Sequence, residues 1–403
     1  MTKLRFIFCF LVVCQVSAWA KVSAFTRWID PSRLGERWEQ HPLERTRPLV
    51  VGDILYYSNL SGDVMAVHRL EGYPLWKKRL PAGVEGALTY ARSKIFVGDT
   101  AGNLFALSAR DGSEIWKFKI QSEWLSAPTV LRDKVFVSSS NDEIFALSEQ
   151  TGKELWHYSH RGDEKMTVRG TGSPAVYGNE VFQGFSDGYL VGLSAVDGKI
   201  LWEKKLRSRE RFYDVDMAPY VDDQSVIAAT FDGKLYSLNR MNGESQWVAS
   251  VGSYGGFLVE NDVVFFSGLN GYFHALDRKT GSVKWKTPFM EGIGLTPTRV
   301  GELIVIPTSS DPLYLIQPKD GEVVWKGGLG AGTLAPVAAS GDDQWFYCLS
   351  NYGVLYSFEV LRSSPFLQRP ETVATPSAIQ RHRDFHEAAP PTPVTPEPEK
   401  QST

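Results

Sequence analysis

The residues best suited to binding another molecule lie in two stretches in the middle of the chain. The first contains Met166, Val168 and Arg169, and the second contains Asp214 and Asp216 beside aromatic residues. Arginine and aromatic side chains next to apolar ones are typical of the anchor residues of protein interfaces. The alternative is that both stretches are solvated insertions whose charges satisfy one another. The residues by themselves leave both interpretations open.

Neither stretch has a pattern typical of catalysis or metal binding. His157 and His160 are close in sequence to acidic residues, but a loop rich in Gly, Ser and Lys does not supply the fixed geometry of a metal site. Asp214 and Asp216 could point to the same side of a strand, yet no acid–base partner is identifiable. The glycine-rich run 327–332 lacks the strand and helix of a phosphate-binding loop. We therefore expect no catalytic residue, no metal ion and no cofactor.

Both stretches interrupt a repeat that runs through most of the chain. One copy, Gly102–Trp116, reads as two short strands joined by a tight turn, with a glycine in the turn and a tryptophan four residues later. Glycine is favoured there because a short hairpin needs a residue at positive φ. A repeat of about 40 residues made of short strands predicts a β-propeller. The tryptophans recur every 38 to 46 residues, at Trp76, Trp116, Trp156, Trp202, Trp247, Trp285 and Trp325.

The two ends of the repeat complement each other. Trp38 precedes Trp76 by 38 residues and ends a shortened copy, so we expect it to be the eighth repeat tryptophan. The strand missing before it appears at the other end, in Gly353–Val360, which no tryptophan follows. We predict an all-β, eight-bladed propeller of four-stranded blades, closed by an N-terminal strand that completes the last blade. Each tryptophan should be wedged between blades, where its burial stabilises the ring by a few kcal/mol.

The connections between blades differ in length. From the tryptophan to the proline of the next blade there are 12 residues after Trp116, but 18 after Trp156 and 17 after Trp202. The two long connections flank the fourth blade. Loops of one class emerge on one face of a propeller, and insertions on a single face often mark its binding side. We therefore expect the two candidate stretches to share one face.

The ends of the chain differ in composition from the repeat. Residues 1–20 have a charged start, an apolar core and a small-x-small end, which predicts a signal peptide cleaved after Ala20. The alternative is a lipoprotein signal, in which Cys14 would be lipidated. Residues 21–362 would form the propeller. Residues 363–403 are rich in proline and poor in apolar residues, which predicts a disordered tail.

The composition agrees with many short strands. The 403 residues include 36 glycines and 12% aromatic residues, which suits strands separated by tight turns. The formal net charge of −3 gives no basic surface for nucleic acid or anionic lipid. Of three cysteines only Cys348 follows the signal segment, so no intrachain disulfide can form after cleavage. Its apolar surroundings in the sequence predict a buried thiol.

The repeat resembles the pyrroloquinoline-quinone-type propeller repeat over about residues 35–360. Quinone-dependent alcohol dehydrogenases share this repeat, typically with a disulfide of adjacent cysteines, calcium ligands and a catalytic Asp that are not found in this sequence. A closer resemblance is to the BamB family of outer-membrane β-barrel assembly factors. Two segments carry it: Met166–Gly170 resembles the family's L-x-L-R-G, and Arg211–Pro219 resembles its R-L-x-D-V-D-x-x-P.

This resemblance implies a non-catalytic periplasmic scaffold in the assembly and insertion of β-barrel proteins at the inner face of the outer membrane. The partner would be a BamA-type barrel-assembly protein, with unfolded outer-membrane proteins as further partners. We expect a monomer within a complex, without nucleic acid, lipid-anchored if Cys14 is modified and peripheral otherwise. The alternatives are a quinone-dependent dehydrogenase and a propeller that binds a solute or envelope component in its central channel. By resemblance, the residues that bind the partner are Met166, Val168, Arg169, Asp214 and Asp216.

Overall fold

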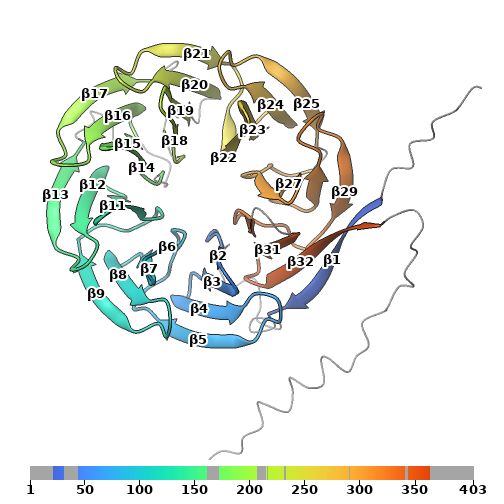
Figure 1. The fold of residues 1–403 in the computed structure, drawn as a ribbon, viewed down its shortest axis with the longest axis horizontal. Coiled ribbons are helices and arrows are strands. Elements are labelled where there is room, and N and C mark those ends of the chain that lie inside the picture. Colours follow the sequence, from blue (N-terminus) through green and yellow to red (C-terminus); the bar gives the residue numbers. More distant parts are fainter. Residues whose placement is uncertain are drawn as a thin grey trace, which may run out of the picture. The chain divides into compact units, whose positions relative to one another are not determined.

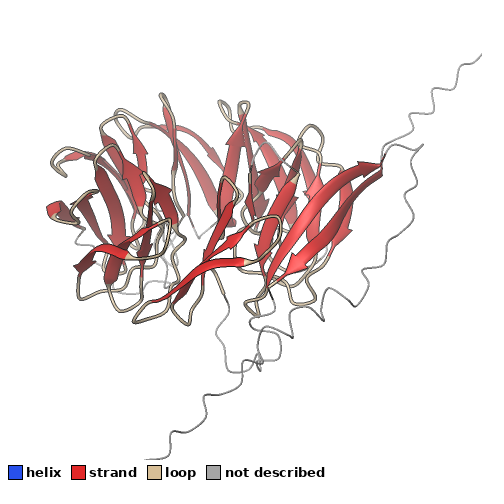
Figure 2. Cartoon of the chain, turned by 60° about the horizontal axis from the view of Figure 1, so that its bottom comes forward, coloured by secondary structure: helices blue, strands red, loops and turns tan. Residues whose placement is uncertain are grey.

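The computed structural model describes residues 21–30, 44–160, 172–206, 215, 217–230, 233–289, 291–340 and 344–363. Within these residues the regular secondary structure consists of strands, which form eight four-stranded sheets. Figure 1 shows the sheets arranged around a common axis as the blades of a ring. Figure 2 shows their strands running between the two faces of that ring. The predicted eight-bladed propeller is confirmed.

Blades 1 to 4 follow the chain, each from its innermost to its outermost strand (Figure 1). Their strands are β2 (Leu49–Val51), β3 (Ile54–Ser58), β4 (Asp63–His68) and β5 (Pro74–Arg79); β6 (Thr89–Ala91), β7 (Lys94–Gly98), β8 (Asn103–Ser108) and β9 (Glu114–Lys119); β10 (Thr129–Leu131), β11 (Lys134–Ser139), β12 (Glu143–Ser148) and β13 (Glu154–Ser159); β14 (Ala175–Tyr177), β15 (Glu180–Gly184), β16 (Tyr189–Ser194) and β17 (Ile200–Lys205).

Blades 5 to 7 continue in the same way, and blade 8 joins both ends of the repeat. Their strands are β18 (Tyr220–Val221), β19 (Ser225–Thr230), β20 (Lys234–Asn239) and β21 (Ser245–Ala249); β22 (Ser253–Glu260), β23 (Val263–Gly268), β24 (Tyr272–Asp277) and β25 (Val283–Pro288); β26 (Thr298–Val300), β27 (Leu303–Ile306), β28 (Leu313–Ile316) and β29 (Val323–Gly327); and β30 (Ala338–Ala339), β31 (Trp345–Leu349), β32 (Leu355–Ser363) and β1 (Lys21–Ile29).

The meander within each blade gives the ring two different faces. The hairpins between first and second strands and between third and fourth strands share one face, where the backbone N–H of Ala109 donates to the carbonyl of Ser93. The turns between second and third strands share the other face with the connections to the next blade, where Thr100 N–H donates to the Gly83 carbonyl. We call the first the hairpin face and the second the insertion face.

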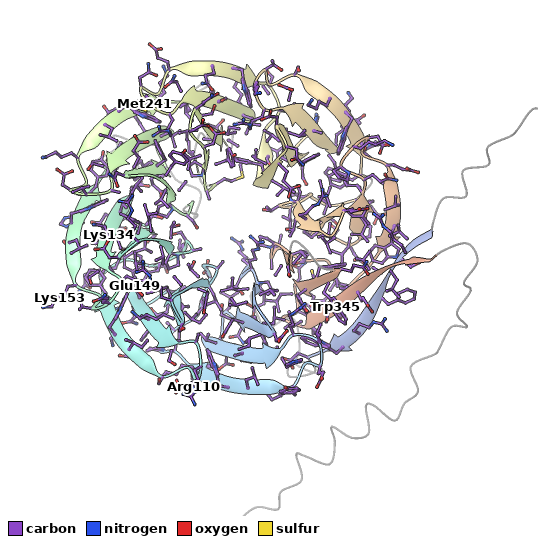
Figure 3. All side chains as sticks on the ribbon, in the orientation of Figure 1. Arg110, Lys134, Glu149, Lys153, Met241 and Trp345 are labelled. Atoms are coloured by element: carbon purple, nitrogen blue, oxygen red, sulfur yellow. The ribbon has the colours of Figure 1, made fainter. Side chains whose placement is uncertain are left out.

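The repeated tryptophans join each blade to the next. Trp116 is 8% exposed and donates its Nε1–H to the carbonyl of Glu149 in blade 3, at 3.0 Å. Its ring lies against Gly152, where a Cβ atom would be 2.5 Å from the ring. The Glu149 carboxylate also pairs with Lys94 of blade 2 at 2.8 Å, so one hairpin (Figure 3) holds two links across the same gap. The same indole bond to the next blade is made by Trp76 to Ala109, Trp156 to Ala195, Trp202 to Arg240, Trp247 to Arg278, and Trp285 to Pro318.

The eighth tryptophan of this set is Trp28, which corrects the prediction for Trp38. Trp28 lies on β1 and donates its Nε1–H to the Arg69 carbonyl of blade 1 at 2.9 Å, and its ring lies against Gly72. Trp38 lies outside the described residues. The prediction assumed that the eighth tryptophan keeps the spacing of the repeat. No hairpin joins β1 to β32, so the position of the tryptophan on β1 does not have to follow that spacing.

Blade 8 is closed by the N-terminal strand, as predicted. β1 pairs with β32, and Asp30 N–H donates to the Leu355 carbonyl while Arg27 pairs with Glu359. These two contacts make the pairing antiparallel, because the residue numbers run in opposite directions. The two strands come from opposite ends of the chain, so no hairpin joins them. Trp325 of blade 7 therefore finds no acceptor hairpin among the described residues, and its ring instead meets Phe358 edge-on at 6.5 Å.

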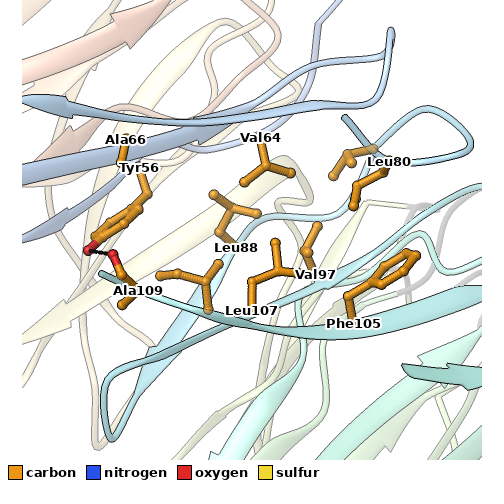
Figure 4. Close-up of a cluster of buried hydrophobic side chains, with 11 residues drawn as sticks. Tyr56, Val64, Ala66, Leu80, Leu88, Val97, Phe105, Leu107 and Ala109 are labelled. Carbon is orange, nitrogen blue, oxygen red and sulfur yellow. Dashed lines mark hydrogen bonds between the residues drawn. The ribbon is translucent and has the colours of Figure 1, made fainter. Parts of the chain in front are cut away.

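The hydrophobic core is divided into layers between adjacent blades. Figure 4 shows the layer between blades 1 and 2, where Val64 and Leu80 face Val97 and Leu107. In the same layer the Tyr56 hydroxyl donates to the Ala109 carbonyl at 3.0 Å. Cys348 belongs to the layer between blades 7 and 8, where burial raises the pKa of its thiol to about 12. Its predicted burial is confirmed.

One core position carries a histidine where another blade has an aromatic ring. His274 of β24 pairs with Phe266, as Phe105 of β8 pairs with Val97. His274 is 2% exposed, its ring stacks on Phe266 and its Nδ1 has no hydrogen-bond partner. Burial, with a smaller contribution from Lys286, lowers the pKa of His274 to about 4.

We expect the substitution His274→Phe to reduce the loss of unfolding free energy that the protein shows at acidic pH. The unfolded chain gains a proton on this histidine near pH 6.5, whereas the folded chain does so near pH 4, so stability is complete above pH 6.5 and falls as the pH drops between these values. After allowance for solvent screening the loss is about 1–2 kcal/mol. Urea denaturation of the parent and variant at pH 7.5 and pH 4.5 measures it. An equal loss in both proteins would contradict the prediction.

Candidate partner-binding face

The two long connections begin and end on the insertion face beside blade 4. The first insertion (residues 161–171) follows β13 and precedes β14, and the second (residues 207–216) follows β17 and precedes β18. Only Val215 within them is described. The predicted partner-binding residues Met166, Val168, Arg169, Asp214 and Asp216 all lie outside the described residues, so their role stays a prediction.

The described ends of the two insertions touch each other. Gly172, which follows the first, lies against the backbone of Met217 and Ala218, which follow the second: a Cβ on Gly172 would be 2.6 Å from the Met217 carbonyl carbon. The Gly172 carbonyl accepts hydrogen bonds from Ser138 Oγ and from Gln183 Nε2, each at 2.9 Å. The two insertions therefore return to the ring at one point, held by buried polar groups of blades 3 and 4.

Val215 fixes the second insertion to the edge of blade 4. Its side chain is fully buried and lies against Gly184, where a Cβ would be 2.3 Å from Val215 Cγ1. Its N–H donates to the Phe185 carbonyl at 3.2 Å. The chain is therefore held at the edge of blade 4 at Val215, the sequence neighbour of the predicted residues Asp214 and Asp216.

A polar cluster lies directly before the first insertion, between blades 3 and 4. His160 is the last described residue before that insertion, and its Nε2 lies 2.9 Å from Asp187 Oδ2. Its Nδ1 lies 3.2 Å from the Tyr158 hydroxyl, and its ring stacks on Phe185 with the centroids 4.4 Å apart. Both side chains are buried, at 8% and 7% exposed. The hydrogen bond from His160 lowers the pKa of Asp187 against its burial.

A second carboxylate completes this cluster. Asp142, in the turn before β12, accepts the N–H of Ser186 at 3.2 Å and also bonds the Ser186 hydroxyl. Burial is the main cause that raises the pKa of Asp142, and Asp187 adds to it. The sequence pattern did not mark Asp142, Ser186 or Asp187 as functional residues. The available signal was the aspartate at a repeat position that holds glycine in most other copies, such as Gly62 and Gly102, and aspartate again at Asp311.

The two histidines of this region have different partners. His157 points to Glu154, with 2.7 Å between Nδ1 and Oε1, whereas His160 is turned into the blade interface. Across the described part of the chain no group of three or more potential ligands has metal-binding geometry. Among the described residues there is also no helix long and apolar enough to span a membrane.

The central channel contains a hollow that bears on the alternative of a bound solute. Its volume is about 470 Å³, and its walls come from the inner strands of blades 1, 2, 3 and 8. Arg47 is the one charged side chain among the described residues that line it. The remaining wall consists of backbone and small or apolar side chains.

The fold and this face together define a closed repeat propeller with its insertions gathered beside one blade. A family model described as outer membrane protein assembly factor BamB matches residues 60–287, more than half of the chain. The chain therefore belongs to this family.

Relatives and solved structures similar to this chain share less than 30% of its residues. The BamB of Legionella pneumophila (strain Paris) is 28% identical over 152 residues, which are 38% of this chain and 39% of that protein. The match thus spans about two fifths of the relative's length. The crystal structure of BamB from Moraxella catarrhalis is 21% identical, with a TM-score of 0.69, and the match covers 84% of this chain and 99% of that one. A quinohemoprotein alcohol dehydrogenase from Comamonas testosteroni is 14% identical with a TM-score of 0.68, over 89% of this chain and 80% of that one. At these identities the two structures show the fold alone.

Proposed function

We propose that this protein is a non-catalytic scaffold in outer-membrane protein assembly, located in the periplasm at the outer membrane. Its partner would be a BamA-type barrel-assembly protein, bound by Met166, Val168 and Arg169 of the first insertion together with Asp214 and Asp216 of the second. Arg169 would pair with acidic groups of the partner or bridge to the two aspartates, while Met166 and Val168 pack on the partner.

The observation that supports this proposal most is the meeting of the two insertions at one point. Gly172 packs against Met217 and Ala218, so two segments that leave different blades return side by side. Apolar, arginine and aspartate residues within a few positions of this point provide a mixed interface of the kind that binds a protein partner. The family membership favours the same role.

We expect the double charge reversal Arg169→Glu with Asp214→Arg to abolish capture of the barrel-assembly protein. Loss of a buried charged group at an interface costs about 2–5 kcal/mol, which is at least a thirtyfold loss of affinity. The measurement is the dissociation constant for the purified periplasmic part of the BamA-type protein, by isothermal titration calorimetry.

The matched control is the double reversal Arg110→Glu with Asp197→Arg on the hairpin face. Both residues are exposed in hairpins between third and fourth strands, Arg110 being labelled in Figure 3, and the change in net charge is the same. The control should bind like the parent protein. Equal binding by both double variants would show that the insertions are not the interface.

A further inference from the structure

One residue at the central channel differs from its equivalents in the other seven blades. Arg47 lies two positions before Leu49, the first residue of β2, and so at the insertion-face end of the channel. The pairing of first and second strands sets the equivalence, because Leu49 pairs with the third residue of β3 and Leu258 of blade 6 with the third residue of β23. The equivalent residues have small side chains or are proline: Ala87, Ala127, Ser173, Ala218, Gly256, Thr296 and Pro336.

These eight positions form a collar around the channel. The N–H of Ala127 donates to Ser173 Oγ at 2.9 Å, and the N–H of Gly256 donates to Thr296 Oγ1 at 2.8 Å. Each of these bonds joins the position in one blade to the same position in the next. Because the repeat builds every blade in the same way, neighbouring positions follow one another round the ring (Figure 1). Arg47 is therefore the one long side chain in the collar.

The guanidinium of Arg47 is available to a ligand. The residue is exposed, and no hydrogen bond or ion pair joins it to another residue in the part of the chain that the structure describes. Arginines that hold neighbouring blades together are paired instead, Arg240 with Glu180 and Arg278 with Asp222. The five N–H donors of a guanidinium form a planar fork that matches a carboxylate or a phosphate. Arg47 can therefore bind an anion.

Arg47 lines the hollow of about 470 Å³, and the side chains around it are mainly apolar. Leu49 and Leu88 contribute to this wall from blades 1 and 2. The two threonines of the wall, Thr89 and Thr129, donate their hydroxyls to backbone carbonyls of the next blade, so those protons are already used. Small-molecule sites have volumes of about 300–1,000 Å³ and combine apolar walls with few polar groups. A single cation beside an apolar wall suits a ligand with an anionic head and a hydrocarbon chain.

We propose that the channel binds an amphiphile with an anionic head. The carboxylate or phosphate of this ligand pairs with Arg47, and its hydrocarbon chain lies in the hollow against the inner strands of blades 1, 2, 3 and 8. The site uses residues outside the two insertions, so it goes beyond the proposed function and does not rest on it.

Isothermal titration calorimetry of the mature protein with four probes tests the ligand class. Octanoate and octyl phosphate carry the two anionic heads on the same chain, octanol carries the chain without charge, and acetate carries a head without the chain. We expect at least one of the two charged amphiphiles to bind with a dissociation constant of about 1 mM or lower. Octanol and acetate should each bind at least tenfold more weakly. Tighter binding of octanoate would point to a fatty carboxylate as the ligand, and tighter binding of octyl phosphate to a lipid phosphate.

Three variants test the site itself. Arg47→Ala should lower the affinity for the charged amphiphile at least tenfold and leave the thermal midpoint unchanged, because Arg47 has no partner among the described residues. Arg47→Lys keeps the charge but loses the planar fork, so its affinity should lie between those of the parent and Arg47→Ala. Ala87→Leu narrows the hollow with Arg47 in place and should also lower the affinity at least tenfold. The control is Arg45→Ala, which removes the same charge from an exposed arginine outside the hollow and should bind like the parent.

Several results would overturn this inference. Neither charged amphiphile binding the parent would exclude the site, and equal affinities for octanol and octanoate would exclude the role of the charge. Parent-like binding by Arg47→Ala or by Ala87→Leu would place the ligand elsewhere. If Arg47→Ala melts at a lower temperature, the comparison of octanol with octanoate on the parent protein still decides, since it needs no variant. None of these readouts involves the barrel-assembly protein, so failure of the proposed interface would leave them unchanged.

Discussion

Removal of β1 should open the ring and lower its stability by about 5 kcal/mol or more. Deletion of residues 21–30 removes the Trp28 wedge, whose truncation alone should cost ~3 kcal/mol or more, and each backbone hydrogen bond to β32 adds about 1 kcal/mol. It also removes the Arg27–Glu359 pair and the bond from the Tyr57 hydroxyl to Asp30. The edge of β32 would then be exposed, and an unpaired edge promotes association between chains.

Thermal unfolding followed by circular dichroism, with size-exclusion chromatography, measures this effect. We expect a lower midpoint and a concentration-dependent fraction of dimer or larger species. The control is deletion of residues 364–403, which should leave both readouts unchanged because this tail is predicted to be disordered. A β1-deleted protein that melts like the parent would mean that the remaining contacts between blades 1 and 8 hold the ring closed without the outermost strand of blade 8.

Replacement of Trp116 by alanine should cost ~3–5 kcal/mol, the usual range for a buried aromatic residue. The indole of Trp116 fills the space above Gly152 and holds the Glu149 carbonyl, so its loss leaves a cavity between blades 2 and 3. The backbone at Gly152 does not move in to fill this cavity, because it has a φ of +67° and forms a tight hairpin turn. Urea denaturation followed by far-ultraviolet circular dichroism measures the loss.

Trp325 supplies the matched comparison, since it has the same place in its blade but meets no hairpin from blade 8. It is partly exposed and contacts Phe358 edge-on, without a hydrogen-bond acceptor for its indole among the described residues. We therefore expect Trp325→Ala to cost about 1–3 kcal/mol, clearly less than Trp116→Ala. Equal losses at both positions would mean that apolar burial alone, and not the hairpin contact, determines the strength of the wedge.

The repeat predicted the fold because its residues act locally. Gly112, at φ +71°, and the tryptophan after it specify one hairpin, and the next copy specifies the next. An array of such units has few ways to bury its faces, and closure by the terminal strand removes its edges. The wrong prediction for Trp38 shows where local residues no longer suffice. β1 is identified by its pairing with β32 and by the contact of Trp28 with Gly72, and both of these join distant parts of the chain.

The sequence by itself determined the propeller, its eight blades, the burial of Cys348 and the two places where the repeat is interrupted. The tertiary structure decided which residues meet across the blades. Asp142 and Asp187 are 45 positions apart and belong to different turns, so no local pattern joins them to His160. Only the packing of blade 3 on blade 4 brings a histidine and two carboxylates together, because such contacts depend on the angle between blades and not on the conformation of either one.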